Sequence, residues 1–193
     1  MISEKLEIPE VVRIRPKRHG DDRGYFYEVF RRHTFGECVE AVDFVQDNEA
    51  FSIAAGTLRG LHFQRNPRAQ GKLVRVIRGA ILDVAVDIRR GSPTYGKYVS
   101  ARLDGIGGDQ LWVPVGFAHA YCTLEPNTLV AYKVTDYYSP SDDGGLRWND
   151  PAIGIEWPDF PGGPILSDKD RHLPLLADLP EVFSYANDNK GGL

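Results

Sequence analysis

Strand-forming residues dominate the chain, and short turn sequences separate the runs. The clearest case is residues 72–89, where two runs rich in β-branched residues meet at Gly79. In the second run Val84, Val86 and Ile88 alternate with small or acidic residues, a period of two that is typical of a strand. Further strands are predicted at residues 24–30, 43–54 and 128–138, and two strands joined by a Pro-Gly turn at residues 110–124.

Helical patterns are short and few. We expect helices only at residues 32–39, near residues 140–144 and in the C-terminal quarter. Many short strands separated by Gly, Pro and Asn turns are typical of antiparallel sandwiches and barrels. The sequence contains no internal repeat and no linker. It therefore predicts a single domain over residues 1–193, with a core at about 25–140, a C-terminal segment at about 141–183 and a frayed tail at 184–193.

The composition fits a globular domain and narrows the classes of function. Of 193 residues, 42% are apolar, which is enough for a real core. The formal net charge of −4 argues against a broad nucleic-acid surface. We expect no secretory leader and no membrane span, because no run approaches roughly 18 apolar residues. Cys38 and Cys122 lack CxxC spacing, so we expect free thiols in a reducing cytoplasm.

Two histidines stand in spacings that are typical of cupins, a jelly-roll superfamily. Residues 108–119 follow the order G-x5-P-x-G-x2-H of the second cupin motif, and Gly56 and His62 have the separation that opens the first. A cupin metal site would next need a second histidine and then a glutamate. Gln64 stands at the histidine position, and the next seven residues contain no carboxylate. Since a divalent transition metal needs three or four ligands, the sequence predicts no metal site.

His62 has two interpretations from the residues alone. A lone histidine in an apolar strand is commonly a core group whose ring nitrogens are hydrogen-bonded. Two cations close to it in the sequence, Arg59 and Lys72, favour a functional role, because packing alone has little use for them. Positive charge nearby would keep the imidazole neutral and able to accept a proton, which is the state a general base needs.

A longer set of motifs is more specific than these spacings. The chain contains, in this order, GDDRGYFYEVF, FVQDN, LRGLHFQ, QGKLVRVIRGAILDVAVDIRRGSPTYGK, QLWVPVGFAHAY, YKVTDYYSP, WNDPAIGIEWP and LSDKD. Together these motifs resemble the dTDP-4-dehydrorhamnose 3,5-epimerase family, over about residues 8–176. The resemblance implies an all-β, cupin-type jelly-roll β-sandwich or barrel with a few short helices.

The resemblance also implies a reaction that uses no cofactor. Members of the family invert one or two carbons beside the C4 ketone of a dTDP-4-keto-6-deoxy sugar, on the route to L-rhamnose for cell-surface polysaccharides. For this chain it implies conversion of dTDP-4-dehydro-6-deoxy-D-glucose to dTDP-4-dehydro-L-rhamnose. The ketone acidifies the C–H bonds at C3 and C5, so the protein must supply a base, an opposing acid and a group that stabilises the enolate oxygen.

Four residues match the catalytic positions of the family. His62 matches the base and Tyr132 the acid, whereas Tyr132 on its own would be interpreted as a core tyrosine. Asp170 matches the partner that fixes the histidine tautomer and stabilises the imidazolium, although on its own it would be a solvated loop charge. Lys72 matches the cation that offsets negative charge on the C4 oxygen.

The remaining matches imply substrate-binding residues. The guanidiniums of Arg23 and Arg59 suit diphosphate oxygens, and Lys169 resembles a substrate-contacting lysine. Hydrogen bonds to the nucleotide or sugar are implied for Glu28, Gln46, Asp47, Asn48, His119 and Asp143. The family is also dimeric with an exchanged N-terminal strand, so Arg23 could serve the partner subunit's pocket, as could Glu28. Without the resemblance, Arg23 would be a turn arginine paired with Asp21 or Asp22.

Two features leave alternatives open. Strict alternation puts Arg59 and His62 on opposite faces of one strand, so a shared pocket requires a bulge or twist near Gly60. Alternatively, Arg59 reaches a neighbouring site across a subunit interface. Many family members carry Gly-Phe where this chain has Ala120 and Tyr121, which leaves open whether C3, C5 or both are inverted. A metal-dependent cupin oxygenase and a non-catalytic binder of nucleotide sugars are the competing functions.

Overall fold

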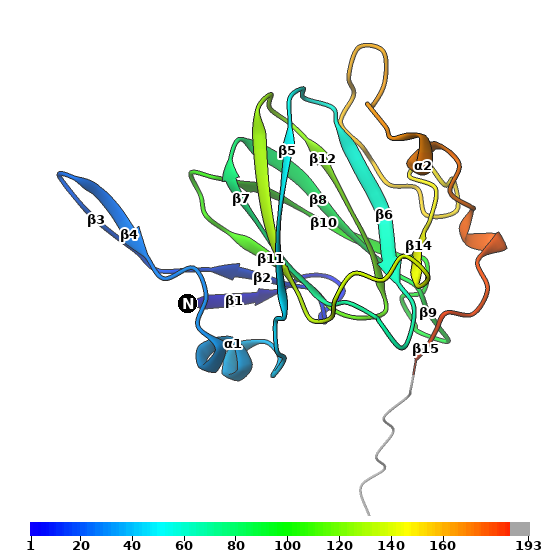
Figure 1. Ribbon diagram of the computed structural model, residues 1–193, viewed down its shortest axis with the longest axis horizontal. Helices are drawn as coiled ribbons and strands as arrows, with labels where there is room; N and C mark the ends of the chain where they lie inside the picture. Colours follow the sequence, from blue (N-terminus) through cyan, green and yellow to red (C-terminus); the bar gives the residue numbers. More distant parts are fainter. Residues whose placement is uncertain (186–193) are drawn as a thin grey trace, which may run out of the picture.

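Two antiparallel β-sheets pack face to face in the computed structural model, which describes residues 1–185 (Figure 1). The larger sheet has the order β1–β2–β11–β7–β13–β5, with bounds Ile2–Lys5, Val12–Arg15, Gln110–Val113, Lys72–Arg78, Thr128–Val134 and Gln46–Ser52. The smaller sheet has the order β10–β8–β12–β6–β14, with bounds Tyr98–Asp104, Ala80–Asp87, Phe117–Thr123, Leu58–Gln64 and Asp143–Gly145. This arrangement confirms the predicted all-β sandwich.

The other elements lie around the sandwich. Figure 1 shows the hairpin of β3 (Arg18–Asp21) and β4 (Gly24–Tyr27) extending away from the two sheets. The remaining elements are α1 (Arg32–Cys38), β9 (Arg89–Arg90), α2 (Asp168–Arg171), the 3-10 helix η1 (Leu176–Asp178) and β15 (Phe183–Ser184). Among residues 1–185, no helix is long and apolar enough to cross a membrane.

The predicted strands are confirmed within a few residues, including the break at Gly79 between β7 and β8. The helix predicted near residues 140–144 is wrong. Ser139 and Ser141 hydrogen-bond the Asp142 carboxylate in a turn, and β14 then pairs with the edge of β6, which satisfies the backbone in an extended form. Strands β1, β2 and β14 also join the sheets from outside residues 25–140. The predicted tail lies, from residue 186 onward, outside the described residues.

Three apolar clusters hold these layers together. The first fills the space between the sheets, with Val74 and Val130 from one side and Ile81 and Ala85 from the other. The second lies on the outer face of the smaller sheet, under the C-terminal segment, and includes Leu61, Val84, Leu146, Leu176 and Phe183. The third places α1 against the outer face of the larger sheet and includes Val12, Ile14, Phe35, Leu73 and Trp112. Both sheets are therefore covered on their outer faces, which fixes the walls of the space between them.

Strand β6 contains a bulge that decides which of its side chains face that space. His62 is paired with His119 of β12, but Arg59 is paired with Tyr121, so three steps along β6 match two steps along β12. An extra residue reverses the alternation of side chains. As a result, Arg59 and His62 line the same cavity, as the bulge expected near Gly60 requires.

Gly60 occupies the bulge for a steric reason. Its φ is +126°, and an added Cβ would lie 2.4 Å from the Ala120 Cβ and 2.6 Å from the Ala120 Cα. Gly24, at the turn of the β3–β4 hairpin, has nearly the same φ of +127° but nothing within 4 Å of an added Cβ. A comparison of alanine substitutions at these two glycines therefore separates the cost of backbone strain from the cost of a steric clash.

We expect Gly60→Ala to lower the free energy of unfolding by about 3 kcal/mol or more, because it combines strain at positive φ with overpacking. Gly24→Ala should cost only about 1–2 kcal/mol, since backbone strain alone applies there. Chemical denaturation of both variants measures the difference. Equal losses would contradict the steric account and indicate that β12 moves aside to accommodate the methyl group.

Candidate active site

The candidate catalytic residues gather in a cavity between the two sheets. A cavity of about 420 Å³ adjoins a smaller one of about 200 Å³. Four side chains line both: His62, Lys72, Tyr132 and Lys169. The larger volume lies within the range of small-molecule sites in proteins.

His62 and Asp170 form a short hydrogen-bonded pair in one wall. The His62 Nε2 lies 2.5 Å from the Asp170 Oδ1, and the imidazole is 29% exposed whereas the carboxylate is 3% exposed. Burial alone would raise the pKa of Asp170, but hydrogen bonding and the charge of His62, with a further hydrogen bond from Ser167, hold that pKa below its usual value. A carboxylate at Nε2 places the ring proton there, which leaves Nδ1 as the nitrogen free to accept a proton.

The short helix α2 carries Asp170 to His62 from far along the chain. Ser167 is the N-cap residue of α2, and its side chain accepts a hydrogen bond of 3.1 Å from the Asp170 backbone N–H. Just before the helix, the Ile165 carbonyl accepts a 2.9 Å hydrogen bond from the Leu58 N–H at the start of β6. The segment that bears the carboxylate is thus fastened to the strand that bears the imidazole.

Tyr132 approaches the same cavity from the opposite sheet. It lies in β13, between Asn48 of β5 and Val74 of β7 in register, whereas His62 belongs to the smaller sheet. Burial raises the pKa of Tyr132, and the charge of Arg59 opposes this shift only in part. The phenol is therefore protonated at neutral pH and able to act as a proton donor.

Lys72 is the cation closest to the His62 backbone. Its Nζ lies 3.5 Å from the His62 carbonyl oxygen, to which it donates a hydrogen bond. Burial lowers the pKa of Lys72 to about 8, an effect that Asp143 and Asp83 counteract and Lys169 reinforces. At neutral pH the side chain is still an ammonium ion, and it is held in a partly desolvated position where its charge acts strongly.

His119 forms a second pair with a carboxylate, deeper than the first. Its Nε2 lies 2.6 Å from the Asp83 Oδ1, and the two side chains are 8% and 0% exposed. Burial lowers the pKa of His119, and the charges of Lys72 and His62 lower it further, against the opposing effect of Asp83. His119 is therefore a neutral hydrogen-bonding group at neutral pH.

Five more of the predicted binding residues line the two cavities, and Arg59 lines the larger one. Its side chain donates a 3.2 Å hydrogen bond to a backbone carbonyl of β5. The Gln46 amide donates to the Asn48 side chain at 2.8 Å, and both residues line the smaller cavity. Lys169 and Asp143 form an ion pair at its rim. Together these residues surround the pocket with amides and cations.

Three predicted binding residues lie elsewhere in this chain. Arg23 is at the turn of the projecting hairpin and pairs with Asp21 at 2.5 Å. Glu28 pairs with Arg31 at 2.8 Å, just before α1. Asp47 is on the outer side of β5 and pairs with a lysine of β13, because alternation along the strand places it opposite Gln46 and Asn48.

The site also includes residues that are not among the predicted catalytic and substrate-binding residues. Asp83, the partner of His119, had a signal, since it is an acidic residue inside an apolar strand. Tyr121 lines the cavity, and its buried hydroxyl has no hydrogen-bond partner among residues 1–185. Tyr138 and Gln64 line the smaller cavity. Gln64 had a signal, because it follows His62 by two residues in the same strand and stands at the cupin histidine position. Tyr138 had none, because it lies in the loop after β13 and reaches the cavity only in the folded chain.

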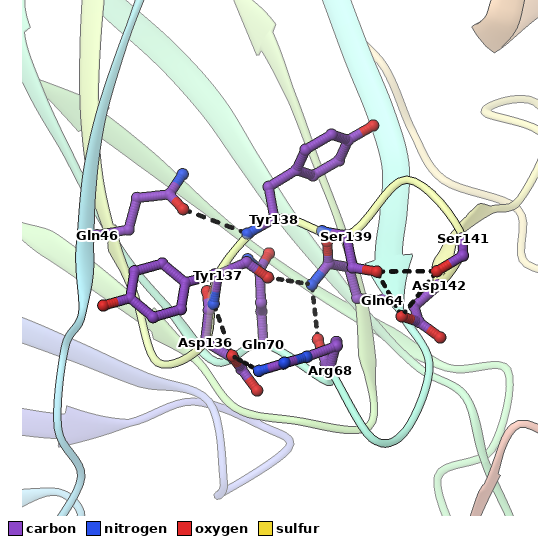
Figure 2. Close-up of polar contacts among 10 residues, drawn as sticks. All are labelled: Gln46, Gln64, Arg68, Gln70, Asp136, Tyr137, Tyr138, Ser139, Ser141 and Asp142. Atoms are coloured by element: carbon purple, nitrogen blue, oxygen red, sulfur yellow. Dashed lines mark hydrogen bonds and ion pairs between the residues drawn. The ribbon is translucent and has the colours of Figure 1, made fainter.

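Gln64 stands where a cupin would place a second metal-ligating histidine. Figure 2 shows its side chain between two loops, where its amide hydrogen-bonds backbone groups of both. Within the part of the chain that the structure describes, no group of three or more His, Cys, Asp or Glu side chains could hold a metal ion.

The sequence has close relatives of known name. A family model described as dTDP-4-dehydrorhamnose 3,5-epimerase matches residues 5–178. The dTDP-4-dehydrorhamnose 3,5-epimerase of Sinorhizobium fredii is 56% identical over 185 residues, which cover 96% of this chain and 94% of that protein.

Solved structures of similar proteins have the same fold. A dTDP-6-deoxy-D-glucose-3,5-epimerase from Legionella pneumophila, solved in complex with dTDP-4-keto-L-rhamnose, superposes with a TM-score of 0.91 at 41% identity and covers 95% of this chain and 98% of that one. A 3′-monoepimerase from Streptomyces bikiniensis, in complex with dTDP-quinovose, has a TM-score of 0.83 at 34% identity and covers 90% and 87%.

The jelly roll and its cavity, with these relatives, define the protein as an isomerase. More narrowly, the chain belongs to the dTDP-4-dehydrorhamnose 3,5-epimerase family.

We expect one lysine to titrate near pH 8, and that signal to be absent from Lys72→Met. Carbon-13 NMR of labelled lysine side chains measures the midpoint. Because the pKa of Lys72 is lower in the folded state than its ordinary 10.5, the unfolded chain binds more protons between these values. The free energy of unfolding, relative to that of Lys72→Met, should therefore rise as the pH increases from 8 to 10.5. A midpoint above about 10 would contradict the burial of this ammonium group.

Proposed function

We propose that this protein epimerises C3 and C5 of dTDP-4-dehydro-6-deoxy-D-glucose to give dTDP-4-dehydro-L-rhamnose. One observation carries the proposal: His62 and Tyr132 line a single cavity from opposite sheets. Inversion of a carbon beside a ketone needs a base on one side of the planar enolate and an acid on the other, because the proton leaves one face and returns to the opposite face.

Each step has a group suited to it. The Nδ1 of His62 removes the proton from the carbon beside the ketone, and the Asp170 carboxylate stabilises the resulting imidazolium. The Lys72 ammonium offsets the negative charge that develops on the C4 oxygen. The protonated phenol of Tyr132 then delivers a proton to the other face of the enolate.

The rest of the cavity supports binding of the nucleotide sugar. Arg59 and Lys169 supply cations for the diphosphate, with the guanidinium able to engage two oxygens at once. The neutral His119 can hydrogen-bond a sugar oxygen without competing with His62 for a proton. Asp143 and the side-chain amides of Gln46 and Asn48 provide further polar contacts.

The relatives support inversion of both carbons. The chain is 56% identical to a protein named as a 3,5-epimerase but 34% identical to the 3′-monoepimerase. A single-carbon epimerase is the second candidate, and it differs from the first in which C–H bond exchanges with solvent.

We expect incubation with dTDP-4-dehydro-6-deoxy-D-glucose in D2O to introduce deuterium at C3 and C5, as measured by NMR. His62→Ala should abolish the exchange, because no base then reaches either carbon. Tyr132→Phe should leave some exchange but impair inversion, since the base still returns protons to the face it took them from. Full activity of His62→Ala would refute the assignment, and a wild-type protein that binds without exchange would support a non-catalytic binder.

We further propose a homodimer in which the hairpin of each subunit reaches its partner. The β3–β4 hairpin projects from the sandwich (Figure 1). It carries exposed aromatic residues, with Tyr25 60% and Phe26 72% exposed. At its turn, the Arg23 side chain is 89% exposed and distant in sequence and structure from the cavity of its own chain. The position of this hairpin supports the proposal that Arg23 contributes to the partner subunit's pocket, together with Glu28, which follows the hairpin directly.

We expect a mixture of His62→Ala and Arg23→Ala proteins, after subunit exchange, to regain about a quarter of wild-type activity. Half of the dimers are then hybrids, and each hybrid has one site with both residues intact. As the control, His62→Ala mixed with Tyr132→Phe should regain nothing, because those residues come from one subunit. An equally inactive Arg23→Ala mixture would place Arg23 in its own subunit's function.

The two cysteines bear on the cellular compartment of the enzyme. Cys38 is an exposed free thiol and Cys122 a buried one. Free thiols support a reducing compartment, and we propose the cytoplasm.

We also propose that residues 1–193 act as one domain, because the C-terminal segment covers the smaller sheet and supplies Asp170 to the site.

A further inference from the structure

Gln64 uses its whole side-chain amide on the backbone of two loops. It is 4% exposed and follows His62 by two residues in β6. Its Nε2 donates hydrogen bonds to the Arg68 carbonyl at 2.6 Å and to the Tyr137 carbonyl at 3.1 Å. Its Oε1 accepts one from the Ser139 N–H at 2.7 Å. The two carbonyls need hydrogen-bond donors and the N–H needs an acceptor. A side-chain amide supplies both, whereas a carboxylate supplies only acceptors.

These two loops border the smaller cavity. The first loop, residues 65–71, leads into Lys72, and the second, residues 135–142, carries Tyr138 to the cavity and leads into Asp143. Figure 2 shows Gln64 between them, with Gln46 of β5 on the other side of Tyr138. The Tyr138 N–H donates to the Gln46 side chain at 3.2 Å, so the segment is held from both sheets.

The loops also meet through the Gln70 side chain, which donates to the Asp136 carbonyl at 2.7 Å, and through backbone groups of Arg65 and Gly71. The ion pair between them is more exposed than the Gln64 amide. Arg68 and Asp136 form an ion pair at 3.1 Å, with side chains 51% and 26% exposed. A pair of this kind in contact with solvent contributes little. The Gln64 amide, in contrast, is buried, and removing it would leave the Arg68 and Tyr137 carbonyls without their donor.

We propose that Gln64 is a positioning residue for substrate binding: its amide holds the loop of residues 135–142 so that Tyr138 and Gln46 form the mouth of the cavity for the nucleotide sugar. This inference rests on the proposed function. His62 and Tyr132 are fixed by the two sheets and not by this loop, so loss of the amide should weaken binding of substrate and transition state alike. In kinetic terms KM rises while kcat is preserved.

The test compares two substitutions of Gln64 with a control. Gln64→Met keeps the volume but makes no hydrogen bond, and we expect KM to rise about 10-fold with kcat within about twofold of wild type. Gln64→Glu presents an oxygen to two carbonyls at neutral pH and should raise KM by at least as much. Arg68→Ala removes only the exposed ion pair and leaves the Gln64 bonds in place, so its KM should stay within about twofold.

The pH dependence of KM distinguishes this role from general damage to the fold. Burial raises the pKa of a carboxyl group introduced at residue 64, so Gln64→Glu regains one donor as the pH falls. The KM ratio of Gln64→Glu to wild type should therefore shrink between pH 8 and about 5.5, whereas that of Gln64→Met should not change. A pH-independent ratio for both variants, an unchanged KM, or an equal effect of Arg68→Ala would overturn the proposal.

Backbone hydrogen exchange provides a readout independent of catalysis. The Ser139 amide should exchange faster in Gln64→Met, which lacks its acceptor, and at the wild-type rate in Arg68→Ala. If the wild-type protein leaves the keto sugar unchanged, the proposed function fails, and this exchange rate together with the affinity for dTDP still decides the role of Gln64. Unchanged protection of Ser139 in Gln64→Met would overturn the proposal by itself.

Discussion

The bulge in β6 is the constraint on which the rest of the site depends. With regular alternation, Arg59 would face the opposite side of the strand from His62, and the cavity would lack one of its cations. The same strand presents the His62 Nε2 to the Asp170 Oδ1 at 2.5 Å. One local departure from β geometry therefore brings the proposed base and a cation to the same cavity.

The two histidine–carboxylate pairs are chemically alike but differ in their access to the cavity. The imidazole of His62 is 29% exposed and that of His119 is 8% exposed, whereas both carboxylates are almost fully buried. Desolvation therefore weighs more heavily on His119 and holds it neutral. The difference in depth explains how one scaffold can hold two similar pairs, one suited to proton transfer and the other to hydrogen bonding.

At residue 64, where a cupin would place a metal-ligating histidine, this chain has a glutamine with a structural role. A histidine there would point a nitrogen ligand toward the cavity, but the glutamine directs its amide to the backbone of two loops (Figure 2). The site also contains a positive charge, the Lys72 ammonium, which lies against the His62 carbonyl in a partly desolvated position. The buried amide and the buried cation thus have separate tasks, one holding the shape of the pocket and the other its electrostatics.

The sequence by itself determined the all-β class, the strands around Gly79 and Gly116, and the pairing of His62 with Tyr132 as candidates, because period-two patterns and ordered motifs are local properties of the chain. It also indicated that a pocket shared by Arg59 and His62 would need a bulge or twist near Gly60. Only the tertiary structure decided that Asp47 faces outward, that Arg23 lies on a projecting hairpin, and that Asp83 and Tyr138 belong to the site. Those positions depend on strand register and on contacts between loops far apart in the sequence, and such contacts exist only once the two sheets have packed together.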